Sequence, residues 1–245
     1  MGNDILTVMW KESKGMLRYG DSRWKAIVTL LTPIAVFGVI FPIQFREAWL
    51  TSLWPVAVSV FTPLLLIAST IAESFAGERE RHTLETLLAS RLPDRSILLG
   101  KLLTSMLFGW GMTLFLLMVS LVVVNLLEWG NGFRFYQPAI FVINILLSWL
   151  VSGMVASLGV LISLRAPTVQ SATQTLVLML FMPFLLLQGV VFILPTFLPV
   201  DTVKGFFESL DLPTIMLIVL LVLLFANLGL FLGAVARFQR SRLIL

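Results

Sequence analysis

The residues that could do chemistry in this chain are concentrated between positions 73 and 101. This segment mixes acidic and basic side chains and holds the only histidine, His82, whereas long apolar stretches flank it on both sides. Carboxylates, guanidinium groups and ammonium groups this close together form charge-assisted hydrogen bonds, either with one another or with another protein. A segment this polar must reach water. We therefore expect it to be a binding surface.

Catalytic and metal-binding chemistry is not indicated. The chain has no cysteine and a single histidine, so it lacks the clustered ligands that a metal site needs. It also lacks a GxxxxGK[ST] segment, the loop that binds ATP phosphates. We expect no catalytic residue, no metal and no cofactor in this chain, and we expect it not to be an enzyme.

The composition is that of a membrane protein. Of its 245 residues, 58% are hydrophobic and only 12% are charged, about half the charged share of a soluble domain. The net charge of +4 fits the enrichment of Lys and Arg in cytoplasmic loops better than it fits nucleic-acid binding.

Six uncharged apolar runs are long enough to cross about 30 Å of hydrocarbon at about 1.5 Å per residue. They predict an all-α membrane protein with six transmembrane helices and one transmembrane domain over residues 1–245. The runs are Ile27–Ile43, Leu53–Ala72, Leu102–Leu127, Pro138–Ser163, Thr175–Val200 and Pro213–Val235.

The basic residues predict the orientation. Six spans put both termini and segment 73–101 on one side, which holds fourteen of the seventeen Lys and Arg residues. The other side holds only Arg46, Arg134 and Lys204. Because cytoplasmic loops are enriched in Lys and Arg, we expect a plasma-membrane protein with both termini in the cytoplasm.

The first 26 residues form no span. Apolar residues alternate with charged ones there, which favours an amphipathic helix at the membrane surface, with Trp10, Tyr19 and Trp24 at headgroup depth. The alternative is a solvated helix that packs on its own loops.

The fifth run contains several prolines and glycines, among them Pro183, Gly189 and Pro195. Since proline removes a backbone donor and clashes with the preceding turn, we expect this span to end near Gln188. A re-entrant or external hairpin should follow, with a second amphipathic helix at Val203–Leu210. The alternative is one long kinked helix with a plain loop.

The predicted spans contain no Asp, Glu, Lys, Arg or His. Ion-coupled carriers usually keep ionisable residues inside the bundle, so a stand-alone secondary carrier is the less favoured function. Asn144, Gln188 and Asn227 are polar amide residues within the spans. They are candidates for hydrogen bonds between helices or for contacts along a transport pathway.

Within segment 73–101, the pattern predicts a helix, a sharp turn and a second helix. Residues Phe75–Ala89 contain good helix formers and no proline, with leucines at i, i+3 and i+4 on one face. Arg91-Leu92-Pro93 should stop this helix, and Asp94 can cap a second one over Ser96–Lys101 that continues into the third span.

These residues carry a resemblance. Phe75-Ala-Gly-Glu-Arg-Glu-Arg-His-Thr-Leu-Glu-Thr-Leu-Leu-Ala, then Arg91-Leu-Pro, then Ile97-Leu-Leu-Gly-Lys resembles a pattern of the type-2 ABC transporter permeases. That pattern is close to F-x-x-E-x-E-x-G-T-L-E-x-L-L-x-x-P-x-x-x-x-x-I-L-x-G-K. The departure is His82, where the family usually has a small residue such as glycine.

The resemblance implies a permease subunit of an exporter, and the uncharged spans are consistent with a hydrophobic or amphipathic cargo. It implies a second copy or a similar permease as partner, and a separate ATP-binding subunit that holds ATP and Mg²⁺. That subunit would contact a cytoplasmic coupling helix between the second and third spans. The implied contact residues are Glu78, Arg79, Glu80, Arg81, Thr83, Leu84, Glu85 and Leu87. An ATPase-driven accessory or regulatory subunit is the alternative function.

Overall fold

The computed structural model describes residues 2–17, 23–83, 89, 91–197, 205 and 211–238. Every regular element within these ranges is a helix, which confirms the predicted all-α class. The elements are α1 (Gly2–Leu17), α2 (Arg23–Pro33), the π-helix η1 (Ile34–Ile40), α3 (Phe41–Phe45), α4 (Glu47–Thr51), α5 (Trp54–Ala72), the π-helix η2 (Glu73–Gly77), α6 (Glu78–Glu80), α8 (Asp94–Leu127), η3 (Trp129–Asn131), α9 (Pro138–Ser163), α10 (Val169–Phe197) and α12 (Leu212–Arg237).

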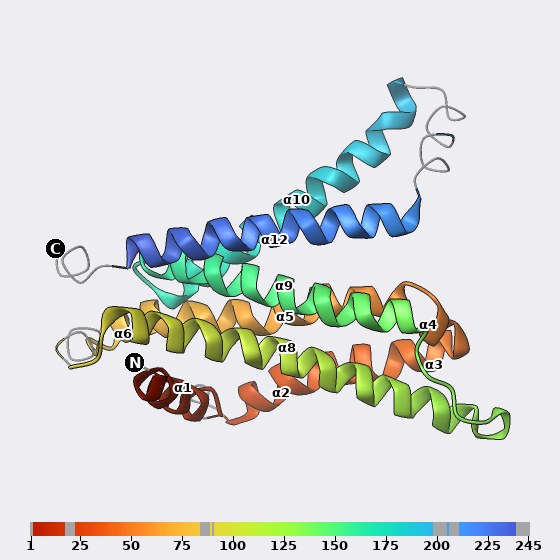
Figure 1. Cartoon of the computed structure of the whole chain (residues 1–245), viewed down its shortest axis with the longest axis horizontal. Coiled ribbons are helices and arrows are strands. Elements are labelled where there is room, and N and C mark those ends of the chain that lie inside the picture. Colours follow the sequence, from red (N-terminus) through yellow and green to blue (C-terminus); the bar gives the residue numbers. More distant parts are fainter. Residues whose placement is uncertain are drawn as a thin grey trace.

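Five helices among the described residues are long and apolar enough to cross a membrane. They are Trp54–Glu80, Asp94–Leu127, Pro138–Ser163, Val169–Val190 and Pro213–Arg237. The chain is thus a multi-pass membrane protein. Figure 1 shows the end of α12, like α1, at the end of the bundle where α6 lies. We call this end the motif end, because it carries segment 73–101, and the opposite end the far end.

The first predicted span is helical but short. Its residues lie in α2, η1 and α3, and the apolar helix Leu30–Phe45 falls short of about 30 Å at 1.5 Å per residue. The helix stops because Arg46 takes a φ of +49°, which turns the chain into α4. The first predicted span, and with it the predicted total of six, is therefore not confirmed.

The other predicted spans agree more closely. The predicted Pro138–Ser163 and the helix α9 have the same bounds. The second span begins at Trp54, one residue after its predicted start, and α12 exceeds the predicted sixth run at both ends.

The fifth span corrects the prediction of a break near Gln188. α10 is one helix from Val169 to Phe197, so it passes through Pro183, Gly189 and Pro195 as the alternative proposed. Prolines are tolerated in transmembrane helices because neighbouring helices and local adjustments satisfy the freed backbone groups. The predicted helix Val203–Leu210 lies outside the described residues, apart from Gly205.

The core lies where α5 packs between α8 and α9 (Figure 1). Glycines allow this close approach: a Cβ built on Gly109 of α8 would lie 2.3 Å from the Cδ1 of Ile67. One built on Gly159 of α9 would lie 2.1 Å from the Cγ2 of Ile71. Small residues let membrane helices approach in this way, so α5, α8 and α9 form the tightly packed part of the bundle.

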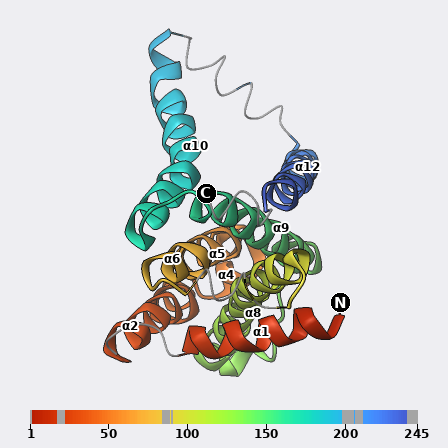
Figure 2. The same cartoon turned by 90° about the vertical axis from the view of Figure 1, so that its left-hand side faces the viewer.

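α10 and α12 lie at the edge of that core, to which they contribute Leu176, Leu180 and Ala234. The two helices diverge toward the far end, as Figures 1 and 2 show. A cavity of about 250 Å³ lies between α5, α9, α10 and α12, and every residue that lines it is apolar. Each of the four helices contributes to its wall, for example with Val60, Val151, Phe184 and Leu223.

Candidate functional site

The helix that begins as α5 ends at the motif end in a Schellman turn. The backbone N–H of Thr83 donates to the carbonyl of Glu78 (2.9 Å), and that of His82 donates to the carbonyl of Arg79 (3.1 Å). His82 has a φ of +54°. This left-handed position after a helix is usually glycine, which explains why the family pattern has a small residue there.

This turn corrects the predicted helix Phe75–Ala89. The helix stops at Glu80 because His82 takes the left-handed conformation, so residues 75–80 are the end of the second span and no separate helix begins at Phe75. Leu84, Glu85 and Leu87 lie outside the described residues. The second predicted helix begins at Asp94 rather than Ser96 and continues without a break into the third span, as predicted.

Glu78 belongs to an ion cluster that joins three elements. Its Oε1 lies 3.1 Å from the Nζ of Lys101 on α8 and 3.0 Å from the Nζ of Lys11 on α1. The Nζ of Lys101 also lies 3.1 Å from Oε1 of Glu12 on α1. Burial lowers the pKa of Lys11, but Glu78 and Glu12 raise it by more, so it lies above its ordinary value. We call Lys11, Glu12, Glu78 and Lys101 the Lys101 cluster.

Lys101 is the centre of this cluster. It is only 1% exposed, although it is an ammonium group that burial alone would strongly disfavour. Besides the two carboxylates, its Nζ donates to the carbonyl of Ser74 at 2.5 Å and lies 4.9 Å from the ring centroid of Phe75. Both residues belong to the π-helix η2. Lys101 thus connects α8 to the base of the second span as well as to α1.

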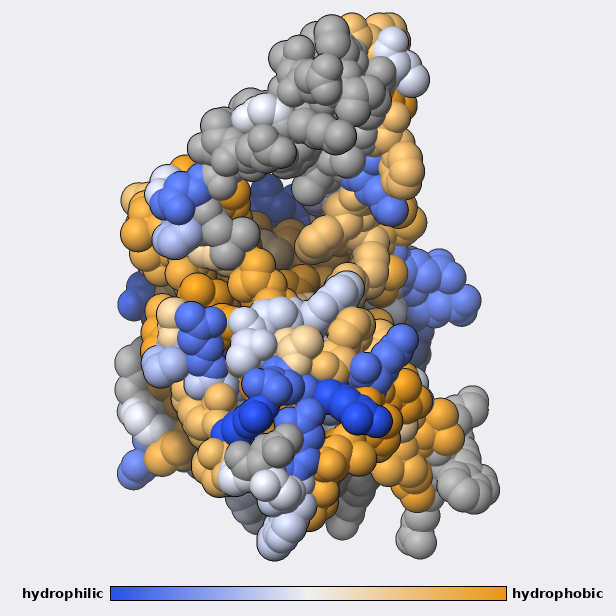
Figure 3. Space-filling view, turned by 90° about the vertical axis from the view of Figure 1, so that its right-hand side faces the viewer, coloured by the Kyte–Doolittle hydropathy of each residue, from blue (hydrophilic) through white to orange (hydrophobic). Residues whose placement is uncertain are grey.

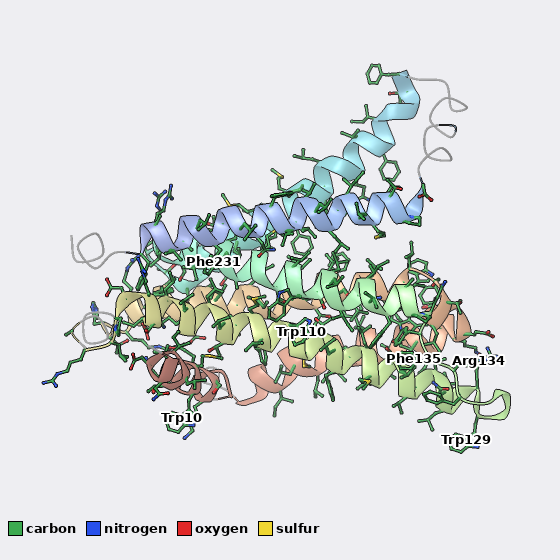
Figure 4. All side chains as sticks on the ribbon, viewed as in Figure 1. Trp10, Trp110, Trp129, Arg134, Phe135 and Phe231 are labelled. Atoms are coloured by element: carbon green, nitrogen blue, oxygen red, sulfur yellow. The ribbon has the colours of Figure 1, made fainter. Side chains whose placement is uncertain are left out.

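The shape of α8 lets α1 reach this cluster. α1 crosses α8 at the motif end (Figure 2), and a Cβ on Gly100 would lie 2.6 Å from the Cβ of Val8. Only glycine allows that contact. On the other face of α1, Leu6 and Trp10 are exposed, and Figure 4 shows Trp10 pointing away from the bundle. α1 therefore has one packed face and one apolar exposed face.

The π-helix η2 is held from the other side by Ser163, at the end of α9. Its hydroxyl donates to the carbonyl of Ala72 (2.9 Å) and accepts the backbone N–H of Ala76 (2.9 Å). Side chains that insert into a helical ladder in this way are a recognised cause of irregular helix geometry. Lys101 and Ser163 thus form side-chain hydrogen bonds with backbone groups in and directly before the π-helix: the carbonyls of Ser74 and Ala72 and the N–H of Ala76.

Arg79 and Glu80 connect the same helix end to the connection between α9 and α10. The guanidinium of Arg79 donates to the carbonyls of Leu164 and Ala166, both at 2.7 Å. Glu80 Oε1 accepts the backbone N–H of Val169, the first residue of α10, at 2.9 Å. A carboxylate there also suits the positive end of the α10 dipole.

The remaining residues of the turn face outward. Arg81, His82 and Thr83 are exposed, and Arg81 forms an ion pair with Glu73. Of the predicted contact residues, the structure therefore places Glu78 and Arg79 in contacts within the chain and leaves Glu80 exposed but bonded to Val169. Arg81 and Thr83 lie on the surface of the turn.

The polar residues of the spans have different environments. Asn144 is fully buried, accepts the hydroxyl of Ser59 at 2.6 Å and donates to the carbonyl of Ile140. Asn227 on α12 donates to the carbonyl of Leu150 on α9 at 2.6 Å. The bonds between Asn144 and Ser59 and between Asn227 and Leu150 connect neighbouring helices. Gln188 is exposed on α10.

Sequence reasoning missed the partners Lys101 and Glu12. The sequence placed Lys101 at the end of a predicted helix and of the family pattern without a partner, and Glu12 was one charge among several in an amphipathic helix. The adjacent Gly100-Lys101 pair carried the signal, because a glycine inside a helix next to a lysine suggests a close neighbour and a charged partner. Among the described residues, no group of three His, Cys, Asp or Glu side chains could hold a metal ion.

Comparison with known proteins identifies the family. A comparison with curated proteins finds no match. The family model described as ABC-2 type transporter matches residues 3–203, a range that includes α1 apart from its first residue, the Schellman turn and the Lys101 cluster. Together with the multi-pass helical fold, this match shows that the chain belongs to the ABC-2 type transporter family and is a membrane-embedded permease.

Proposed function

We propose that this chain is the membrane subunit of an ABC exporter, driven by ATP hydrolysis in a separate ATP-binding subunit that docks on the motif end. The observation that carries the proposal is the Schellman turn. Its outer residues Arg81, His82 and Thr83 are exposed, whereas the residues directly before them are bonded to three neighbouring elements. A partner that pushes on this turn therefore also displaces the elements bonded to it: α1, α8 and the connection between α9 and α10.

Two connections would carry that displacement into the membrane. Glu78 passes it to α8 through Lys101. Arg79 and Glu80 pass it to the start of α10 through the carbonyl of Ala166 and the N–H of Val169. Because α10 packs less tightly than α8, it is the more easily moved of the two spans that these connections reach.

The docking surface extends into residues 84–93. The leucines Leu84 and Leu87 would fill an apolar groove of the ATP-binding subunit, as desolvated central residues do in other interfaces. Arg81, Thr83 and Glu85 would set the register at its rim. On this proposal Glu78, Arg79 and Glu80 act inside the permease, behind the docking surface.

A hydrophobic or amphipathic cargo suits the membrane part best. The predicted spans carry no ionisable side chain, and the cavity between α5, α9, α10 and α12 is lined by apolar residues alone. Such a lining offers no hydrogen bonds to a strongly polar solute, whose transfer into it would be costly.

A second permease copy, identical or similar, completes the proposed transporter. α10 and α12 bury little of their apolar surface in this chain: none of the most apolar window of α12 is buried, against 67% of that of α5. The whole chain then works as one permease domain, over residues 1–245, in the plasma membrane with both termini in the cytoplasm. A C-terminal reporter that is inaccessible from outside intact cells supports this orientation, and an externally labelled one overturns it.

The docking proposal is tested with a co-expressed P-loop ATP-binding subunit from the same organism. Leu84→Asp and Leu87→Asp should abolish its co-purification with the permease, because each places a carboxylate in an apolar groove. Arg81→Glu should weaken it. The matched control is Arg46→Glu, which reverses an exposed arginine at the far end and should leave co-purification intact. Unchanged association in all three motif-end variants contradicts the docking surface.

A further inference from the structure

Lys101 has a position that the docking proposal does not use. Among the described residues it is the one charged side chain that is fully buried, at 1% exposure. Its Nζ contacts Glu78 at the end of the second span, Ser74 in the π-helix η2 and Glu12 on α1. One side chain of α8 thus joins α1 and the end of the second span, which are far apart in sequence.

We propose that Lys101 is a positioning residue that makes the N-terminal helix α1 a moving part of the coupling unit, displaced together with the turn when ATP binds. The proposal rests on the proposed function. It concerns α1, which otherwise would serve only to attach the chain to the membrane surface.

The first support is charge balance. Lys101 is one ammonium between two carboxylates that are themselves largely buried, Glu12 at 16% and Glu78 at 14% side-chain exposure. Lys11 supplies a second ammonium from α1. If α1 left its place, Lys101 would lose one carboxylate and Glu78 would lose one ammonium. Buried charges that lose a partner are strongly disfavoured, so α1 and the turn should move together.

The second support is shape. Gly100, the residue before Lys101, lets Val8 of α1 approach so closely that an added Cβ would lie 2.6 Å from it. A helix that needed only to rest on the membrane surface would not require this fit.

The third support is the contact of Lys101 with the carbonyl of Ser74. Because Lys101 also contacts Glu12 of α1, this contact connects α1 to the π-helix immediately before the turn.

The absence of cysteine from the chain allows a direct experiment. Leu6 is 63% exposed on the outer face of α1, so Leu6→Cys can carry a polarity-sensitive fluorophore that reports the depth of α1 in the bilayer. The labelled permease is reconstituted in liposomes with its ATP-binding subunit, and emission is recorded before and after ATP. We expect an ATP-dependent shift.

Two variants should remove this shift while the ATP-binding subunit still co-purifies. Gly100→Ala pushes α1 away from α8 without changing any charge, and Glu12→Gln removes the carboxylate while keeping its shape. The matched control for the first is Gly111→Ala on the same helix, where an added Cβ meets nothing within 4 Å. Glu12→Asp, which keeps the charge, should restore part of the shift.

The outcomes separate this inference from the proposed function. If ATP hydrolysis proceeds in the complex but the Leu6→Cys probe does not respond, α1 is a static attachment and the inference is wrong. The same holds if Gly100→Ala and Glu12→Gln respond like Gly111→Ala. If no ATP-binding subunit associates with the unaltered chain, the proposed function fails and the inference fails with it.

Discussion

Two ion clusters, one at each end of the bundle, use similar side chains in different ways. At the motif end, Lys101 is buried and contacts Glu12 and Glu78. At the far end, Arg134 pairs with Glu47 and lies 3.4 Å from Glu128, with side-chain exposures of 32%, 55% and 15%. Figure 3 faces the far end and shows hydrophilic residues on its surface, and Figure 4 marks Arg134 there.

The difference in burial separates the roles of the two clusters. The far-end cluster connects the α4 helix to the loop between α8 and α9, where water can replace a lost partner. The Lys101 cluster connects α1, the end of the second span and α8, where a lost partner leaves a charge without compensation. Surface ion pairs contribute about 0–1 kcal/mol, whereas breaking a buried pair costs about 3–5 kcal/mol. Four variants test this contrast.

Lys101→Met should have the largest effect. It leaves the carboxylates of Glu12 and Glu78 near one another with only Lys11 to balance them, so the free energy of unfolding should fall by about 3–5 kcal/mol. Chemical unfolding in detergent micelles measures it. Lys14→Met, which removes an exposed lysine from the same region, is the control. Equal losses in the two variants would mean that the buried Lys101 contributes no more to stability than an exposed lysine.

Arg79→Ala should have the next largest effect. It removes two charge-assisted hydrogen bonds to the carbonyls of Leu164 and Ala166, and bonds to charged groups contribute about 1.5–3 kcal/mol each in favourable cases. We expect a loss of about 2–3 kcal/mol in the same assay. Arg165→Ala, which truncates an exposed arginine in that loop, should change little. An unchanged free energy of unfolding in Arg79→Ala would mean that water replaces the guanidinium.

Tyr136→Phe tests the buried part of the far end. The Tyr136 hydroxyl lies 2.6 Å from Ser120 and donates to the carbonyl of Leu117, so its loss should cost about 1 kcal/mol. Burial raises the pKa of Tyr136 to about 12, above an unfolded value of about 10.

The raised pKa of Tyr136 predicts a pH dependence. A folded pKa above the unfolded one stabilises the fold below about pH 10, and this contribution is lost as the pH rises from about 10 through about 12. The unaltered chain should therefore lose more stability than Tyr136→Phe across this window. Parallel pH profiles for the two proteins would contradict the assignment.

Arg134→Ala should have the smallest effect. Glu47 and Glu128 raise the pKa of Arg134, but the group is in contact with water. The unfolding midpoint should change less than for Tyr136→Phe, and the change should vanish in high salt, because salt screens exposed charges. A large, salt-independent loss would place Arg134 in the same class as Lys101.

The elements were easier to predict than the contacts between them. Uninterrupted apolar runs fix where a helix can cross the membrane, so α9 could be predicted to the residue. α10 was predicted to break near Gln188, because its prolines disfavour a helix locally, yet the surrounding helix continues. Local propensity does not include the support that membrane neighbours give to freed backbone groups.

The site residues show the same limit. Alternating charges indicated a binding surface at Glu78, Arg79 and Glu80, but charge alone does not say whether the partner is another protein or another helix of the same chain. Their bonds to Lys101, Ala166 and Val169 depend on contacts between residues that are distant in sequence. No periodicity encodes such contacts.

The left-handed conformation of His82 has a mechanical consequence. Glycine at such a position rotates almost as freely at negative φ as at positive φ, so it makes a compliant joint. A histidine side chain narrows the accessible range and makes the joint stiffer. If an ATP-binding subunit docks on this turn as proposed, the link between the membrane helix and the docking surface is stiffer here than it would be with glycine, so a smaller part of the partner's displacement is lost before it reaches the spans.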